Sequence, residues 1–295
     1  METQDKIREI ANKYIIHEKI GSGKFGTVYA GLYKKTKKNN NCEKVAIKME
    51  DLRTNAKLLK HETAILKYLY DHGCRTIPIV FWYGIYEDHT CLAMSFYDIS
   101  LFDFIKKREL TAEQINKIMV AAIEILESVH KLFVLHRDIK PQNFMIKNGE
   151  LFLIDFGLST FFLRENGEHV IECSQESIIG TPKYISFYVH DGLLPGVRDD
   201  LISLGYLYIY LYCRELPWDV LQNNVLDNKI FTELSIEHPK NLQRKELKSW
   251  AYLEPISLKI NQNIHRFLGH CYGLKYKDVP NYEGLRKALD SNTLF

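Results

Sequence analysis

The sequence predicts an α+β fold, with an antiparallel sheet in the N-terminal part and mainly helices in the C-terminal part. Alternating segments rich in β-branched and aromatic residues occur up to about residue 94, and helical patterns prevail from residue 100 onward. A polar loop at residues 136–143, flanked by short apolar runs, interrupts the helical part. With 295 residues, 46% hydrophobic and 26% charged, the chain is long enough for one large domain of two lobes.

Net charge and cysteine spacing exclude several classes of function. A formal charge of +2, from 39 basic and 37 acidic residues, indicates neither nucleic acid nor an anionic membrane as a partner. The 6 cysteines contain no Cys-x-x-Cys pair, so we expect reduced thiols rather than a zinc ribbon or a disulfide framework. The N-terminus lacks a signal peptide's apolar core, and the longest apolar stretch, residues 204–213, is too short to span a bilayer. We therefore expect a soluble protein of the cytoplasm, the nucleus or both.

A glycine-rich stretch follows the first predicted strand, residues 14–20. Glycines at positions 21, 23 and 26 let backbone amides approach phosphate oxygens closely, because no Cβ intervenes. A dinucleotide-binding fold uses similar glycines but opens a helix directly after them. Here Thr27, Val28 and Tyr29 follow, and these residues favour a second strand. The glycines are therefore predicted to lie in a hairpin that covers phosphate oxygens.

The next strand ends in Lys48. A lysine at the end of a buried strand is costly unless an anion meets it, and both nucleotide phosphates and a carboxylate on the following helix are available. That helix is predicted over residues 55–71, with Glu62 among its apolar residues. By position alone, Glu62 is equally well a solvent-facing helix residue.

Residues 79–93 are predicted to form two strands joined by a turn at residues 87–89. The stretch 94–98 would then connect the two lobes and offer main-chain groups to an adenine ring. Val28 and Ala46 would lie above this ring and Met145 below it, although these apolar residues equally suit an ordinary core.

Helical features follow this connection. Residues 100–107 are predicted to form a short amphipathic helix, and Thr111 with Gln114 begins a capping sequence for a long helix that ends near Val129.

Asp138, Lys140 and Asn143 lie within the polar loop 136–143. A hydroxyl nucleophile needs an acceptor for its proton, a transferring phosphoryl group needs a cation, and a metal needs an oxygen donor; the three residues offer these groups in that order. The alternative interpretation is a polar turn between two strands. Asp155, after a predicted strand at residues 151–154 and before Gly157, is suited to hold Mg²⁺ against phosphate oxygens.

Taken together and in this order, the glycine hairpin, Lys48, Glu62, residues 136–143 and residues 155–157 resemble eukaryotic protein kinases.

Two later segments narrow the resemblance. Residues 180–188 (Gly-Thr-Pro-Lys-Tyr-Ile-Ser-Phe-Tyr) and 198–206 (Arg-Asp-Asp-Leu-Ile-Ser-Leu-Gly-Tyr) resemble the casein kinase 1 family, as do Leu-Pro-Trp at 216–218 and residues 278–286. The chain lacks the Ala-Pro-Glu with which most kinases close their activation segment. Vaccinia-related kinases are near relatives, but the residues around Lys183 and Asp200 fit casein kinase 1 better.

The resemblance implies a bilobal protein kinase fold in a single domain, residues 1–295, with an N-lobe at about 14–94, a hinge at 95–98 and a C-lobe at 99–295. It implies a monomeric serine/threonine protein kinase that uses ATP and Mg²⁺ and acts on acidic or phospho-primed proteins. Lys140, two residues after Asp138, agrees with serine/threonine specificity. The hinge sequence, residues 95–98, departs from the relatives' usual Glu and Gly, which puts details of the nucleotide pocket in doubt.

The resemblance also assigns roles to single residues. The catalytic residues are Asp138, Lys140 and Asn143, and the metal ligands are Asn143 and Asp155. The implied nucleotide-binding residues are Ile20, Gly21, Ser22, Gly23, Lys24, Phe25, Gly26, Thr27, Val28, Ala46, Lys48, Glu62, Phe96, Tyr97 and Met145. Asp200 is expected to hold the backbone of the catalytic loop.

Lys183 and Lys229 are the implied site for the substrate's anionic group, although both are equally well solvated surface charges. Lysine is a poorer bidentate partner than arginine, and Glu176 stands where a relative would offer lysine, so we expect a weakened preference for primed substrates.

Two other functions remain open: a pseudokinase that binds partners without chemistry, and a small-molecule kinase. We also expect activity without an upstream kinase, because the activation segment itself supplies carboxylates near basic groups. These are Glu165, Glu168, Glu172 and Glu176.

Overall fold

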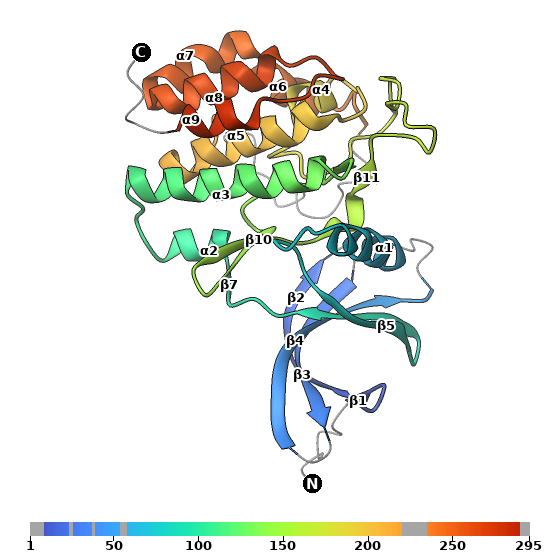
Figure 1. Ribbon diagram of the computed structural model, residues 1–295. Helices are drawn as coiled ribbons and strands as arrows, with labels where there is room; N and C mark the ends of the chain where they lie inside the picture. The colour runs from blue at the N-terminus through green and yellow to red at the C-terminus, as the bar shows by residue number, and fades with distance from the viewer. Residues whose placement is uncertain (1–8, 24–25, 37–38, 54–57, 220–234, 290–295) are drawn as a thin grey trace. The chain divides into compact units, whose positions relative to one another are not determined.

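The computed structural model describes residues 9–23, 26–36, 39–53, 58–219 and 235–289 (Figure 1). The chain divides into two compact units. The first comprises Met1–Ile99 and Met145–Gly157, and the second comprises Ser100–Phe144 and Leu158–Phe295. Within the described ranges, no helix has the length and apolar character needed to cross a membrane.

The first unit contains a six-stranded antiparallel sheet of order β1-β2-β3-β4-β6-β5. Its strands are β1 (Glu9–Ile10), β2 (Tyr14–Gly23), β3 (Gly26–Thr36), β4 (Asn39–Asp51), β5 (Val80–Tyr86) and β6 (His89–Ser95). The predicted strand pair at residues 79–93 is confirmed, with a tighter turn of Glu87 and Asp88, because His89 already begins β6.

Strand β4 is buried on both faces over residues 45–50, in agreement with its position between β3 and β6 in the sheet. Val45, Ile47 and Met49 point into an apolar cluster on one face. Lys48 points to the opposite face, which packs against helix α1 (Leu58–Asp71). The predicted helix is thus confirmed over its described residues, and its buried side includes Glu62.

Short strands mark the places where the chain passes from one unit into the other. β7 (Ile99–Ser100), β9 (Phe144–Lys147) and β10 (Glu150–Leu153) form a sheet of order β10-β9-β7. Asn148 and Gly149, both with positive φ, make the tight turn between β9 and β10. After β10 comes a 3₁₀ turn at Phe156–Leu158.

In the second unit, two short strands, β8 (Val134–Leu135) and β11 (Thr160–Phe161), pair with each other. The remaining described elements are the helices α2 (Leu101–Lys106), α3 (Ala112–His130), α4 (Phe187–His190), α5 (Val197–Cys213), α6 (Pro239–Leu247), α7 (Trp250–Ile260), α8 (Gln262–Gly273) and α9 (Tyr282–Lys287).

Helix α5 forms the core of the second unit. Every residue from Val197 to Leu211 is buried, and α5 packs against α3, α7 and α8 (Figure 1). The longest apolar stretch of the sequence therefore belongs to a core helix. α3 begins with the predicted capping box of Thr111 and Gln114. The α+β class, an antiparallel sheet followed by a helical region, is confirmed.

Candidate active site

The glycine-rich stretch forms the predicted hairpin. β2 and β3 pair up to their ends, with Ser22 opposite Thr27 and Gly23 opposite Gly26. Gly26 has a φ of +113°, and a Cβ there would lie 2.1 Å from the carbonyl oxygen of Met49, so no larger residue fits. Lys24 and Phe25 lie outside the described residues. Since a strand follows the glycines, the dinucleotide-binding alternative is wrong.

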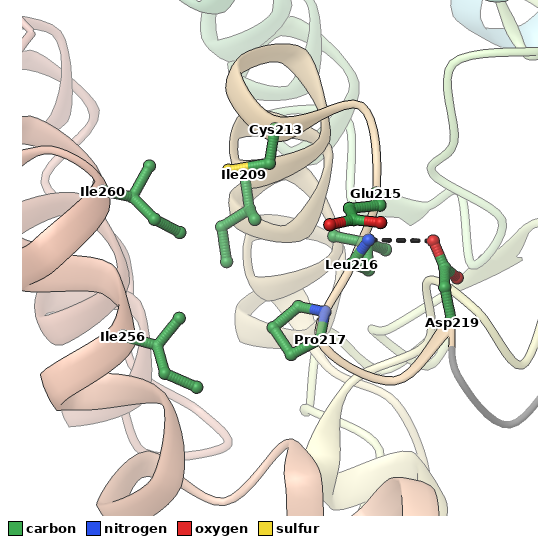
Figure 2. A pocket seen from close by; sticks show the side chains of 8 residues that line it. All are labelled: Ile209, Cys213, Glu215, Leu216, Pro217, Asp219, Ile256 and Ile260. Carbon is green, nitrogen blue, oxygen red and sulfur yellow. Dashed lines mark hydrogen bonds between the residues drawn. The ribbon is translucent and has the colours of Figure 1, made fainter.

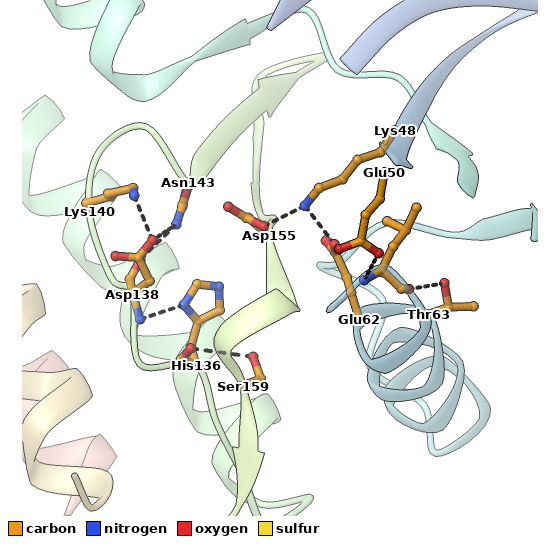
Figure 3. A network of polar contacts seen from close by, with 11 residues as sticks. Lys48, Glu50, Glu62, Thr63, His136, Asp138, Lys140, Asn143, Asp155 and Ser159 are labelled. Atoms are coloured by element: carbon orange, nitrogen blue, oxygen red, sulfur yellow. Dashed lines mark hydrogen bonds and ion pairs between the residues drawn. The ribbon is translucent and has the colours of Figure 1, made fainter. Parts of the chain in front are cut away.

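Lys48 lies between two carboxylates of the first unit (Figure 3). Its Nζ donates to Oε2 of Glu62 at 2.7 Å and to Oδ1 of Asp155 at 2.8 Å. Burial alone would lower the pKa of Lys48, but the attraction of the two carboxylates outweighs it and raises the pKa above its ordinary value. The predicted ion pair is confirmed, and the solvent-facing alternative for Glu62 is wrong, because Glu62 is 1% exposed.

Asp155 occupies an unusual backbone position. It follows the end of β10 with a φ of 67°, a left-handed conformation that few side chains adopt and that Asp tolerates better than most. Its side chain is 25% exposed, so the carboxylate stays accessible although it binds Lys48. Backbone strain at a charged, accessible residue is typical of functional sites.

The remaining residues predicted to bind nucleotide also belong to the first unit. Ala46 lies opposite Met94 in the β4–β6 pair, and both are buried. The ring of Tyr97 packs on Phe152 with centroids 4.8 Å apart, so the side chain of Tyr97 belongs to the core and leaves its main chain for other contacts.

Other residues of the same set are more open. Ile20 is exposed, while Val28 and Met145 are half-buried. Phe96 is half-buried as well, with the ammonium of Lys44 5.6 Å from its ring centroid.

Asp138, in the second unit, accepts hydrogen bonds from three side chains. Lys140 Nζ donates to Oδ2 at 2.6 Å, Asn143 Nδ2 to Oδ2 at 3.1 Å, and Thr181 Oγ1 to Oδ1 at 2.6 Å. Figure 3 shows the loop that carries Asp138, Lys140 and Asn143. An ionised carboxylate accepts about four hydrogen bonds, so about one position remains for a further hydroxyl.

The backbone of this loop is fixed by Asp200, which lies in α5. The amides of His136 and Arg137 each donate to the Asp200 carboxylate at 2.8 Å, and His130 Nε2 lies 3.0 Å from it. Burial alone would raise the pKa of Asp200, but these bonds and the nearby histidines lower it. The structural role predicted for Asp200 is confirmed.

Gly180 lies in the activation segment, the part of the chain that also carries Glu165, Glu168, Glu172 and Glu176, and it brings this segment against the loop 136–143. Its φ is +106°, and a Cβ there would lie 2.6 Å from the carbonyl oxygen of Arg137. Only glycine allows this approach, which places Thr181 beside Asp138. Thr181 was not predicted as a site residue. The Gly-Thr sequence at 180–181 was the one local indication, but the partner of Thr181, Asp138, is distant in sequence.

A second contact holds the activation segment without any modification. Nη2 of Arg198 donates to Oε1 of Glu172 at 2.6 Å, and the guanidinium carbon lies 3.7 Å from the ring centroid of Tyr188. Glu172 therefore does stand near a basic group, as the sequence predicts.

Lys183 already has an anionic partner. Its Nζ lies 2.6 Å from Oδ2 of Asp219, and 4.8 Å from the ring centroid of Tyr210. The same Asp219 oxygen accepts the amide of Leu216 at 2.8 Å, as Figure 2 shows. Asp219 was not predicted from the sequence. Lys229 lies outside the described residues.

The proposed metal ligands offer the hard oxygen donors that suit Mg²⁺. In the first unit, Asp155 offers a carboxylate. In the second unit, the side-chain amide nitrogen of Asn143 donates to Asp138, so the amide oxygen of Asn143 is the atom that could bind a metal. In the part of the chain that the structure describes, no three His, Cys, Asp or Glu side chains group as a metal site, so phosphate oxygens and water would complete the coordination.

Comparison with known families agrees with this geometry. A family model described as a protein kinase domain matches residues 14–281. The match begins at the first residue of β2 and includes Lys48, Glu62, Asp138, Asn143, Asp155 and Asp200.

Proposed function

Because the chain belongs to the protein kinase family and is therefore a phosphotransferase, we propose that it is a serine/threonine protein kinase of the casein kinase 1 type. It transfers the γ-phosphoryl group of ATP to a serine or threonine hydroxyl of a protein. The observation that carries this proposal is the Asp138 carboxylate, held by Lys140, Asn143 and Thr181 with room for about one more hydrogen bond.

The proposed reaction follows from these contacts. Asp138 accepts the proton of the substrate hydroxyl. At the same time the hydroxyl oxygen forms a bond to the γ-phosphorus, and the bond between the γ-phosphorus and the bridging oxygen of ADP breaks. Lys140, whose Nζ lies 2.6 Å from Asp138 and 3.0 Å from Thr181, neutralises negative charge on the transferring group. The role of Thr181 is to keep both charged groups in place.

In the first unit, Lys48 binds phosphate oxygens of ATP. Its two carboxylate partners keep the ammonium charged and fix its direction, which lowers the cost of ordering it when the nucleotide binds. Mg²⁺ supplies further neutralisation of phosphate charge when bound. Asp155 is the proposed ligand of the first unit and Asn143 that of the second.

The casein kinase 1 type rests on residues 180–188 and 198–206 of the sequence and implies a preference for acidic or phospho-primed substrates. Lys183 supports an anion site, but its pairing with Asp219 means that a substrate phosphate must compete with a carboxylate of the protein. We therefore propose a weak preference for primed substrates.

The Glu172–Arg198 pair supports activity without an upstream kinase, because a carboxylate that the protein already carries ties the activation segment to α5 without an added phosphate. Phosphatase treatment of the recombinant enzyme should leave its rate unchanged; a silenced enzyme would contradict this. We also propose a monomer of the cytoplasm, the nucleus or both, which sedimentation and fractionation would test.

One experiment distinguishes this function from its alternatives. The purified chain is incubated with labelled ATP, Mg²⁺ and casein. Label on serine and threonine of casein supports the proposal. Nucleotide binding without transfer would indicate a pseudokinase, and ATP consumption that needs a small-molecule acceptor would indicate a small-molecule kinase.

A further inference from the structure

The amino group of Lys248, directly after α6, is completely buried in the second unit. Lys248 is 0% exposed. Its Nζ donates to the carbonyl oxygens of Pro182 and Ile185, each at 2.7 Å, and lies 3.1 Å from Nε2 of His190. Lys248 therefore donates to two backbone carbonyls and has a histidine ring as its third polar neighbour.

The acceptors of Lys248 are neutral, unlike those of the other lysines that the site uses. Burial lowers the pKa values of His190 and of Lys248 well below their ordinary values, so the His190 ring is neutral. Nε2 of this ring also lies 3.3 Å from the carbonyl oxygen of Pro182. The faces of Trp218 and Tyr206 complete the surroundings, with ring centroids 4.7 and 5.1 Å from Nζ. An apolar side chain would fill this space at lower cost, so Lys248 must contribute through its hydrogen bonds.

Those hydrogen bonds fix a segment that has no regular structure. Residues 182–185 form a turn between Thr181 and α4. Lys248 binds the first and last carbonyls of this turn, and Trp218 Nε1 binds the carbonyl of Lys183 at 2.7 Å. The backbone of the turn is therefore set from inside the unit by two side chains, Lys248 and Trp218.

The same turn adjoins the reacting groups. Thr181, the residue before it, donates to Asp138. Residues 182–185 therefore directly follow a side chain that contacts the proposed proton acceptor, and a peptide whose hydroxyl reaches Asp138 would lie near them. A shift of about 1 Å in groups that position a substrate costs on the order of a hundredfold in rate.

We propose that Lys248 is a positioning residue for the protein substrate. It holds residues 182–185 so that the turn presents a fixed surface to the peptide beside Asp138. This inference rests on the proposed function, because it assigns the turn to protein substrates.

The test uses Lys248→Met and Lys248→Arg in the full chain, with steady-state kinetics for a casein-derived peptide and for ATP. Methionine fills the space but removes the donor that both carbonyls share, so the KM for the peptide should rise about tenfold or more while the KM for ATP stays unchanged. Arginine, which keeps donors in a different geometry, should restore part of the peptide binding.

Two further variants keep the test decisive if Lys248→Met folds poorly. Trp218→Phe removes the Nε1 donor and keeps an aromatic ring, and it should raise the same KM. Lys245→Met, at a half-buried lysine of α6 that pairs with Asp191, is the matched control and should leave both KM values as they are.

A parallel rise of both KM values, or an unchanged peptide KM in Lys248→Met and Trp218→Phe, would overturn the proposal. Amide hydrogen exchange provides a readout that does not need activity. The amides of Tyr184 and Ile185, which donate to Thr181 O at 2.7 and 3.0 Å, should exchange faster in Lys248→Met. If the wild-type chain phosphorylates no peptide, the proposed function fails; unchanged exchange at these amides would refute the role of Lys248 itself.

Discussion

The hydroxyl of Thr181 donates to Oδ1 of Asp138 at 2.6 Å, while Nζ of Lys140 donates to the oxygen of the same hydroxyl at 3.0 Å. One threonine thus ties the activation segment to two charged residues of the catalytic loop, Asp138 and Lys140. Its contribution depends on the hydroxyl and not on its bulk, which makes it a sharp target for substitution.

Thr181→Val should lower kcat/KM for a peptide substrate by about tenfold to a hundredfold, since the isosteric side chain removes one buried hydrogen bond to each of Asp138 and Lys140. Thr181→Ser should keep activity within a few fold of wild type. Thr90→Val, in strand β6 where valine fits well, is the control. Equal activity of the Thr181→Val and Thr181→Ser proteins would show that the hydroxyl has no role.

Asp155→Asn should reduce turnover by more than tenfold, about 1.4 kcal/mol of barrier, with little loss of stability. Lys48→Met should abolish turnover and also destabilise the first unit by about 3–5 kcal/mol, because it leaves Glu62 buried without its cation.

The double variant Lys48→Met/Glu62→Gln should recover most of this stability without recovering activity. Urea unfolding and kcat, measured for all of these proteins, separate the two effects. A Lys48→Met protein as stable as wild type would contradict the described ion pair, and Lys34→Met, at an exposed pair, is the control.

Asp219→Asn should strengthen the preference for phospho-primed peptides several-fold, because it releases the ammonium of Lys183 and keeps an acceptor for the Leu216 amide. The ratio of kcat/KM for a primed peptide to that for its unphosphorylated twin measures this preference, and added salt should reduce it.

Adding Lys183→Ala to Asp219→Asn should remove the gain. The double variant Lys183→Ala/Lys229→Ala should likewise bring the wild-type ratio close to one. If these ratios equal the wild-type ratio, Lys183 and Lys229 take no part in binding the substrate phosphate.

Stability should respond to pH through two neighbouring carboxyl groups with opposite shifts. Burial raises the pKa of Asp199 from 3.8 to about 6, against hydrogen bonds from Gly196 and Ser186. Between about pH 4 and 6, Asp199 keeps a proton in the folded state that it releases in the unfolded chain. The contribution of Asp199 to the free energy of unfolding is therefore fully present below about pH 4 and is lost as pH rises through about 6. Asp200, whose pKa is lowered, contributes stability that is lost as pH falls below about 4.

Asp199→Asn should therefore gain stability relative to wild type as pH rises from 4 to 7, by at most about 3 kcal/mol. Denaturant unfolding at several pH values measures this difference. Asp191→Asn, at an exposed position, is the control. A difference between Asp199→Asn and wild type that stays constant over this range would refute the assignment.

Much of the fold and of the site was predictable because its signals are local. Three features indicate their chemistry within a few residues each: the glycine spacing before Thr27, Lys48 among the apolar residues of β4, and the polar loop around Asp138. The cost of burying Lys48 predicted an anionic partner, and the resemblance to protein kinases indicated that Glu62 is that partner.

The contacts that were missed depend on partners far apart in sequence. Lys248 ends a strongly charged run, residues 244–248, which is typical of a solvated helix end, and its burial depends on the carbonyls of a turn more than sixty residues earlier (248 minus 185 is 63). The pairing of Lys183 with Asp219 likewise needs the fold of the second unit. Sequence patterns identify charged groups but not which distant group neutralises them.

The central claim is tested most directly by phosphoryl transfer from labelled ATP to three peptides that differ only in having serine, threonine or tyrosine at one position. Wild type should label the serine and threonine peptides and not the tyrosine peptide. Asp138→Asn should lose at least about a hundredfold in rate, the typical contribution of a general base, whereas Asp103→Asn, at an exposed site in α2, should match wild type. Transfer to tyrosine, or an Asp138→Asn protein as fast as wild type, would contradict the account.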